Sequence, residues 1–136
     1  MDLASIIVKS KTVEMEYPGC PDFNISVAYL TRDELMKLRE RCTTQKFNKK
    51  SRQPEEEVDN ELFQDLYIEA VVKGWTGLKY KYVLNMIPVD PATIENVEDD
   101  LEFTASNANV LMKNCSDFDS WISTQLEDVG NFTKDS

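Results

Sequence analysis

The sequence predicts a single, mainly α-helical domain in which four or five helices follow a small N-terminal β-hairpin. Its 136 residues fit one domain that buries a core without disulfides or metals. Apolar residues alternate with polar ones near the N-terminus and recur at helical spacing over most of the rest. Within domain 1–136 we expect a hairpin at 12–30, a helical part at 31–129 and a frayed tail at 130–136.

The hairpin is predicted from two alternating segments on either side of a turn signal. TVEMEY at 12–17 and FNISVAYL at 23–30 both place apolar residues at every second position, the period of a half-buried strand. PGCPD lies between them and combines prolines with a glycine. Because an isolated hairpin is only marginally stable, we expect the next helix to cover its apolar face.

That next helix is predicted over TRDELMKLRERCT at 31–43. Thr31 as N-cap with Glu34 three residues later forms a capping-box pattern. Its apolar stripe comprises Leu35, Leu38 and Cys42. QKFNKKSRQ at 45–53 is predicted to be a basic, mobile connection, because Phe47 is its only large apolar residue.

The strongest helical pattern is PEEEVDNELFQDLYIEAVVK at 54–73. Pro54 suits a first helical turn, and the glutamates after it complement the helix dipole. The broad apolar face comprises Val58, Leu62, Phe63, Leu66, Tyr67, Ala70 and Val71. Such a face is typical of a central helix with neighbours on more than one side. Gly74 is expected to end it in a left-handed conformation.

The C-terminal third predicts two more helices. Pro88 and Pro91 break any long helix, and residues 94–100 are ambiguous between a short helix and a loop. One helix is predicted from about Ser106, and a last one begins with Ser116 as its cap. The apolar stripe of the last helix comprises Phe118, Trp121, Ile122 and Leu126.

The net charge of −10 argues against non-specific nucleic-acid binding, because phosphates are repelled. The charge is unevenly distributed: residues 1–53 carry +3 and residues 54–136 carry −13. In a self-associating protein such polarity favours head-to-tail contacts. The alternative is an acidic, solvated surface that aids solubility.

Other classes of protein are excluded or disfavoured. There is no apolar run of membrane-spanning length, and the first 15 residues lack the features of a signal peptide, so we expect a cytosolic protein without membrane contact. Cys20, Cys42 and Cys115 are then reduced, and their spacing matches no metal site. They are interpreted as buried small hydrophobes or unreactive surface thiols.

The sequence does not indicate an enzyme. It contains no histidine, which removes the commonest general base and metal ligand. Paired carboxylates remain possible at Glu55–Glu57 and at Asp99–Asp100, but such acidic runs are usually solvated. No phosphate-binding loop or nucleophile elbow is present. We predict no catalytic, cofactor-binding or metal-binding residues.

Aromatic and apolar residues in predicted loops and at the last helix are the candidates for partner binding. Trp75 lies in GWTGL, where it either packs back onto the preceding helix or contacts a partner, since tryptophan is favoured at binding hot spots. We favour the first interpretation of Trp75. The candidate partner-binding residues are Phe47, Trp75, Leu78, Tyr80 and Trp121.

The order of these segments resembles a known family. An N-terminal hairpin, YLTRDELMKLRERC, a basic connection, a long helix with an acidic start, GWTGLK and LEFTASNANVLMKNCSDFDSWI follow one another over roughly residues 10–127. This resembles the tail assembly chaperones of long-tailed, lambda-like bacteriophages. GWTGL together with FTASNANVLM carries the more specific part of the resemblance.

The resemblance implies a function in the cytoplasm of the bacterial host. Such chaperones bind the tape measure protein, keep it soluble and help recruit major tail protein for tail tube polymerisation, and they are absent from the mature virion. Many occur in two forms through ribosomal frameshifting, and this chain is then the short form. Self-association into a ring or spiral around the client is expected. The alternative function is a small acidic adaptor or inhibitor that binds a basic protein surface.

Overall fold

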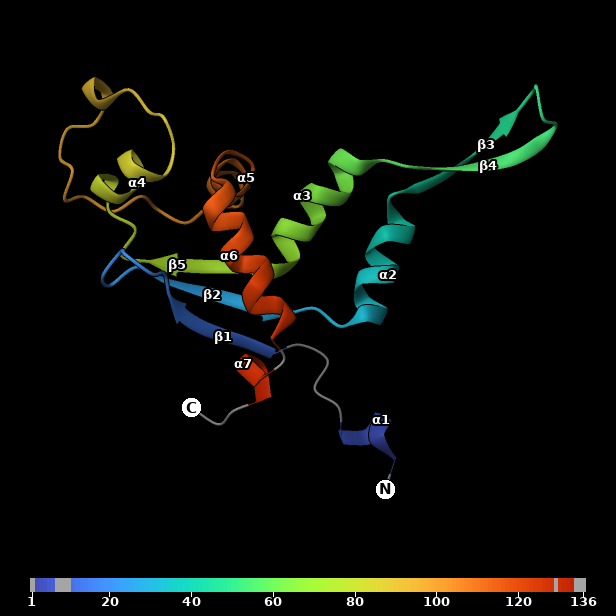
Figure 1. The fold of residues 1–136 in the computed structure, drawn as a ribbon, viewed down its shortest axis with the longest axis horizontal. Helices are drawn as coiled ribbons and strands as arrows, with labels where there is room; N and C mark the ends of the chain where they lie inside the picture. The colour runs from blue at the N-terminus through green and yellow to red at the C-terminus, as the bar shows by residue number, and fades with distance from the viewer. Residues whose placement is uncertain (1, 7–10, 129, 134–136) are drawn as a thin grey trace.

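The computed structural model describes residues 2–6, 11–128 and 130–133, and it has a mixed α/β fold (Figure 1). The prediction of a mainly α-helical fold with one small hairpin was wrong, because the described residues form five strands in two sheets. The strands are β1 (Lys11–Glu16), β2 (Asn24–Tyr29), β3 (Thr43–Asn48), β4 (Gln53–Val58) and β5 (Val72–Thr76). The helices are α1 (Leu3–Ile6), α2 (Arg32–Arg41), α3 (Asn60–Val71), α4 (Tyr80–Met86), α5 (Ala105–Asn114), α6 (Ser116–Glu127) and α7 (Gly130–Thr133), with a 3-10 turn at Pro91–Thr93.

The first sheet is antiparallel with the order β1-β2-β5. Its first two strands confirm the predicted hairpin, with Val13 opposite Val27. The third strand was missed: β5 follows α3 without a connection and pairs with β2, with Trp75 opposite Ile25. Gly74 therefore lies inside a strand and does not end the helix. A central strand whose alternate side chains are fully buried needs a partner on both edges, and β5 supplies the second one.

The second sheet is a separate hairpin, β3–β4, which projects from the body (Figure 1). It was predicted as the mobile connection 45–53 followed by a helix start at Pro54, and both predictions were wrong. Pro54 instead lies opposite Phe47, and Lys46 forms an ion pair with Glu57 across the strands. Opposite charges on facing strands stabilise such a pair. The predicted all-helical part 31–129 is interrupted here and again at β5.

Two predicted helices are present with modified boundaries. At α2 the backbone N–H of Glu34 donates to Thr31 Oγ1 at 3.1 Å, which confirms Thr31 as the N-cap. Helix α3 begins only at Asn60, where the Asp59 carboxylate accepts from the N–H of Leu62 at 3.1 Å. The prediction that α2 covers the hairpin was wrong, because α2 packs on α3 and the sheet is covered by α3, α5 and α6.

The C-terminal helices agree more closely with the sequence. Helix α5 has Thr104 as its N-cap, and α6 begins one residue earlier than expected because Cys115, not Ser116, is its N-cap. The ambiguous residues 94–100 contain no helix. The frayed-tail prediction was wrong for 130–133: these form α7, whose buried Phe132 packs on Tyr29 with ring centroids 5.0 Å apart. Residues 134–136 lie outside the described part.

The core joins the sheet to α3, α5 and α6 through aromatic contacts. Phe23 and Phe118 are fully buried and stacked, with ring centroids 6.2 Å apart. Trp75 meets Phe103 edge to face at 4.9 Å, and its Nε1 donates to the Leu101 carbonyl oxygen at 2.9 Å. Cys20, Cys42 and Cys115 are buried with free thiols, so the interpretation as buried small hydrophobes is confirmed.

Candidate partner-binding surfaces

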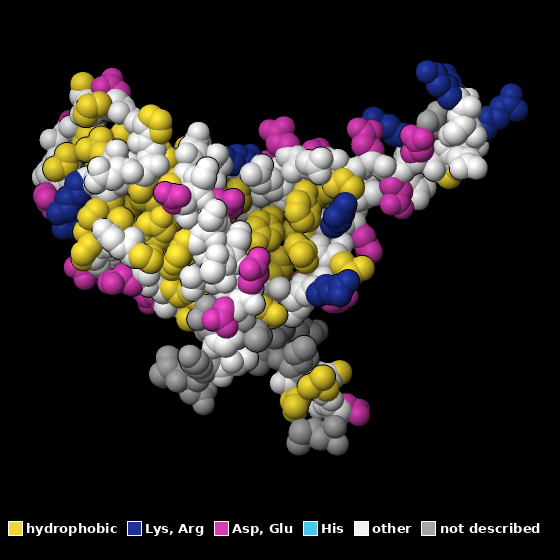
Figure 2. Space-filling view, viewed as in Figure 1, with side chains coloured by type: hydrophobic (Ala, Val, Ile, Leu, Met, Phe, Trp, Pro, Cys, Tyr) yellow, Lys and Arg dark blue, Asp and Glu magenta, His cyan; other side chains and the backbone are white. Residues whose placement is uncertain are grey.

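The β3–β4 hairpin, Thr43–Val58, is an exposed arm. Every residue of β4 except Val58 is exposed, and Phe47 on β3 is 65% exposed. The turn at its end carries the basic tip, defined as Lys49, Lys50 and Arg52, which is visible at the upper right of Figure 2. A two-stranded hairpin without a covered face is marginal in water. The arm therefore has no covered face of its own, and contact with a partner would stabilise it.

A second candidate is an apolar cleft at the other end of the molecule. The α4–α5 cleft has a volume of about 210 Å³ and lies between α4, the segment after it and α5. Its apolar lining includes Val83, Ile87, Val89, Ile94, Leu101 and Leu111. Tyr80 and Val110 also line it, and Val110 is 47% exposed. An exposed valine at the edge of an apolar cleft marks a surface that a side chain from another molecule can contact.

The α4–α5 cleft adjoins the acidic loop, defined as residues 95–102. Five of its eight residues are acidic and none is basic. The loop is fixed to α4, because the N–H of Tyr80 donates to the carbonyl oxygen of Asp99 at 2.9 Å. Glu98 accepts from Lys79 Nζ and Lys81 Nζ, each at 3.2 Å, and these hydrogen bonds lower the pKa of Glu98. The acidic loop thus presents its charge in a fixed position.

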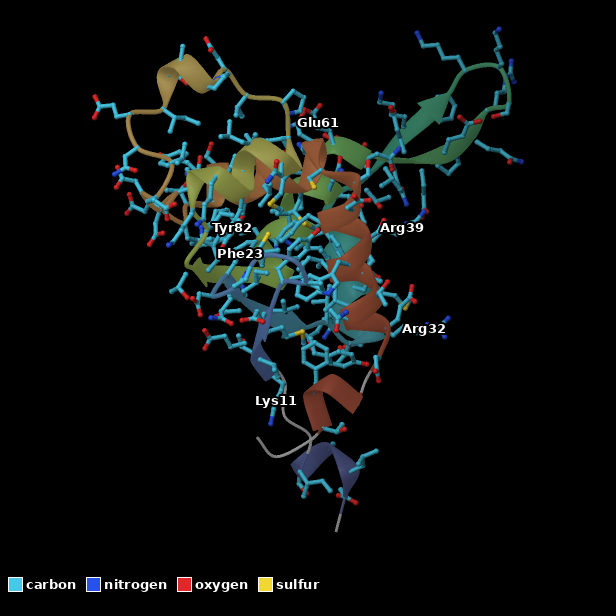
Figure 3. The ribbon with its side chains drawn as sticks, turned by 60° about the vertical axis from the view of Figure 1, so that its left-hand side comes forward. Lys11, Phe23, Arg32, Arg39, Glu61 and Tyr82 are labelled. Carbon is cyan, nitrogen blue, oxygen red and sulfur yellow. The ribbon has the colours of Figure 1, made fainter. Side chains whose placement is uncertain are left out.

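The segment that carries the cleft is anchored to the sheet. The Tyr82 hydroxyl donates to the carbonyl oxygen of Pro21 at 2.9 Å, and Figure 3 shows Tyr82 next to Phe23 at this junction. The Leu101 N–H donates to the Leu78 carbonyl oxygen at 2.7 Å. Both ends of the segment around the cleft are therefore tied to the core.

A third candidate is the α3 face, a set of half-covered apolar side chains between α2 and α6. Figure 2 shows hydrophobic side chains gathered over α3 in this region. Phe63 and Tyr67 are half-buried with stacked rings 6.2 Å apart, and Leu35 of α2 is 36% exposed. Burial raises the pKa of Tyr67, and the nearby Asp119 charge adds to the shift. The side chains of the α3 face are thus partly buried by their neighbours, and the rest of their surface is exposed to solvent.

A polar network joins α3 to α5 behind that face. The Asp65 carboxylate accepts from the Asn109 side chain at 2.8 Å and forms an ion pair with Lys113. The hydrogen bond from Lys113, followed by that from Asn109, lowers the pKa of Asp65 below its usual 3.8. A carboxylate with a lowered folded-state pKa stabilises the fold above its unfolded-state pKa and stops doing so as the pH falls through its folded-state pKa.

We therefore expect Asp65→Asn to lower the melting temperature at pH 7, with the difference from wild type shrinking as the pH falls through the lowered folded-state pKa of Asp65. Thermal unfolding followed by circular dichroism over this pH range measures it. Asp33→Asn is the control. Asp33 pairs with Lys37 on the exposed surface of α2, and such exposed pairs contribute little to the stability of the fold. A variant that melts like wild type at pH 7, or whose deficit does not shrink at all on acidification, contradicts this account.

The structure separates the five candidate residues into three groups. Trp75 and Leu78 are buried, so their side chains belong to the core, although Trp75 packs from strand β5 and not from a turn below its own helix. Phe47 is exposed on the arm, and Tyr80 lines the α4–α5 cleft. Trp121 is half-buried, with its ring edge to face with Tyr17 at 5.1 Å. Phe47 and Tyr80 remain available for a partner.

Sequence reasoning missed Val110 and the α3 face as candidate surface residues. Helix α5 turns Ala108, Leu111 and Met112 into the core, which leaves Val110 between them at the surface. Phe63 and Tyr67 had been recognised as widening the apolar face of α3. The sequence does contain a signal for the α3 face, namely the width of the apolar stripe. When the stripe is too wide for a neighbouring helix to cover, some of its apolar side chains stay at the surface.

The described residues give no indication of metal or membrane chemistry. Among them, no group of three His, Cys, Asp or Glu side chains is placed to hold a metal ion. No helix in the described ranges is long and apolar enough to cross a membrane. Comparisons with protein-family models, with curated proteins and with solved structures found no match to this chain. The surfaces above and the sequence resemblance are therefore the basis for a functional proposal.

Proposed function

We propose that this protein is a non-enzymatic tail assembly chaperone of a long-tailed bacteriophage that acts in the host cytoplasm. It binds the tape measure protein, keeps it soluble and promotes tail tube polymerisation with the major tail protein, and it self-associates in a ring or spiral. It is absent from the mature virion. The α3 face carries the proposal: an acidic protein that leaves adjoining aromatic side chains half-covered has a surface for an apolar client.

The shape of the α3 face suits a helical client. Phe63 and Tyr67 are one helical turn apart on α3, and α2 packs beside α3 with Leu35 36% exposed. An amphipathic helix binds such a surface by laying its own apolar stripe between the flanking helices. The net charge of −10 then keeps the complex soluble through mutual repulsion.

Co-expression with the tape measure protein of the same phage tests the proposal. We expect the wild-type chain to move most of the client from the pellet to the supernatant. Phe63→Asp should lose most of this effect, since a charge on the α3 face blocks apolar contact. Gln64→Asp is the matched control, because Gln64 is exposed on the same helix. Equal solubility of the client with and without the wild-type chain would overturn the proposal.

The alternative, an acidic inhibitor of a basic site, is less well supported. Such an inhibitor should concentrate its acidic side chains on one rigid surface. The acidic loop is one such fixed surface, but on the face shown in Figure 2 acidic side chains are also scattered over several other elements. The three glutamates of β4 lie opposite Thr44, Gln45 and Lys46 of β3, and Glu57 forms an ion pair with Lys46. This distribution favours the chaperone.

A further inference from the structure

We infer that copies of this chain associate head to tail, with the β3–β4 arm of one copy seated in the α4–α5 cleft of the next. The arm and the cleft are the two surfaces through which the self-association in the proposed function would occur, so this inference rests on that self-association. It does not depend on binding of the tape measure protein. Three observations carry it: an apolar knob that matches an apolar hole, opposite charges around both, and the placement of the two at opposite ends of one molecule.

The knob is Phe47. It is the only large apolar side chain on β3 and is 65% exposed, so its ring has no core of its own to enter. Burying an aromatic ring of this size is among the largest single gains available to an interface. The hole is the α4–α5 cleft, whose volume of about 210 Å³ accommodates one large side chain.

The charges around knob and hole are complementary on balance: the arm carries four basic residues against three acidic ones, and the acidic loop carries five acidic residues, of which Glu98 pairs with Lys79 and Lys81. The basic tip follows Phe47 directly along the chain, and the acidic loop borders the cleft through residues such as Tyr80 and Ile94, which line both the cleft and the hollow beside Glu95 and Asp99. Seating the ring in the cleft therefore brings positive charge close to negative charge. Such pairing at the rim fixes orientation and speeds association.

One molecule cannot make this contact with itself. The arm projects at one end of the long axis, and α4 with the acidic loop lies at the other (Figure 1). A second copy offers both surfaces at once, and each copy then has one arm and one cleft to use. Contacts between two different surfaces of the same chain repeat and generate a ring if they close or a spiral if they do not. The occupant of the cleft is therefore the arm of a neighbouring copy.

A mixing experiment tests this geometry with the full chain alone. The arm variant is Phe47→Ala with Lys49→Glu, and the cleft variant is Val110→Arg, which places a bulky positive group at the mouth. Sedimentation at low salt should show wild-type chains growing beyond a dimer with concentration, while either variant stays monomeric. Because each variant retains the surface that the other has lost, an equimolar mixture should stop at a one-to-one dimer. Unaltered circular dichroism spectra establish that both variants are folded.

A control variant and the salt dependence of assembly accompany the mixing experiment. Gln45→Ala, on the same strand as Phe47 and exposed, should assemble like wild type, and high salt should weaken assembly of the wild type. A wild-type chain that stays monomeric at every concentration overturns the inference, as does a mixture that remains monomeric. If the wild type is monomeric but Val110→Arg abolishes client solubility, the cleft belongs to the client and the chaperone proposal survives without this interface.

Discussion

Trp75→Ala will destabilise the fold by about 3–5 kcal/mol, the usual range for truncating a buried tryptophan. The side chain is only 7% exposed and fills the space between Phe103 and Phe23, edge to face with both. Truncation also leaves the Leu101 carbonyl oxygen without its indole donor. Because total stabilities are about 5–15 kcal/mol, much of the variant population will be unfolded at 37 °C.

Chemical denaturation followed by tryptophan fluorescence and circular dichroism measures this loss. Trp75→Phe should recover most of it, since a ring remains in the core and only a hydrogen bond of about 1 kcal/mol is removed. Trp121→Ala is the comparison, and its smaller cost reflects a side chain that is half-buried. A Trp75→Ala variant as stable as wild type would show that Trp75 is not a core residue.

Gly77→Ala will destabilise the fold by roughly 2–5 kcal/mol, the sum of a left-handed backbone penalty and a steric one. Gly77 has φ +75°, and a Cβ there lies 2.0 Å from the carbonyl oxygen of Asp22. The obstacle is backbone in the turn that leads into Phe23, so no side-chain rotation relieves the clash. The turn and β5 would have to separate, which disturbs the core around Phe23.

Gly74→Ala is the matched control, because it changes the same residue type three positions away. Nothing lies within 4 Å of a Cβ at Gly74, and its φ is not positive. We expect this variant to differ from wild type by less than about 1 kcal/mol. Equal melting temperatures for the two variants would contradict the structural role of Gly77.

The sequence analysis predicted a left-handed glycine in this segment, but it chose the wrong glycine. Gly74 was expected to end the helix in a left-handed conformation, whereas Gly77 has the positive φ. The cause lies in Val71 and Val72, which continue the apolar pattern of α3 while one ends the helix and the other begins β5. Pairing with β2, which is distant in sequence, decides this boundary, and local periodicity does not contain that information.

The arm was missed for a different reason. Residues 45–53 are basic and residues 54–57 acidic, which fits a connection followed by a helix start. The same charges also fit two facing strands, as the pairing of Lys46 with Glu57 shows. A hairpin without a covered face lacks the alternation of apolar residues that predicts strands elsewhere. The N-terminal hairpin, which has that alternation, was predicted correctly.

The sequence predicts exposure best for an apolar residue that lies in an otherwise polar segment. Phe47 was selected because it is the only large apolar residue in a polar segment, and it is exposed. Leu78, in contrast, was selected because it is close to Trp75 in the sequence, and its side chain is fully buried. Exposure of an apolar residue depends on which elements pack over it, so the α3 face and Val110 became visible only with the fold.

Affinity capture of a tagged tape measure protein from cells that co-express this chain tests the central claim most directly. We predict that the wild-type chain co-elutes in several copies per client and that Phe63→Asp does not, while Gln64→Asp behaves like wild type. The amount of each protein in the eluate gives the ratio. A client that is captured without the wild-type chain would contradict the claim that this protein is its chaperone.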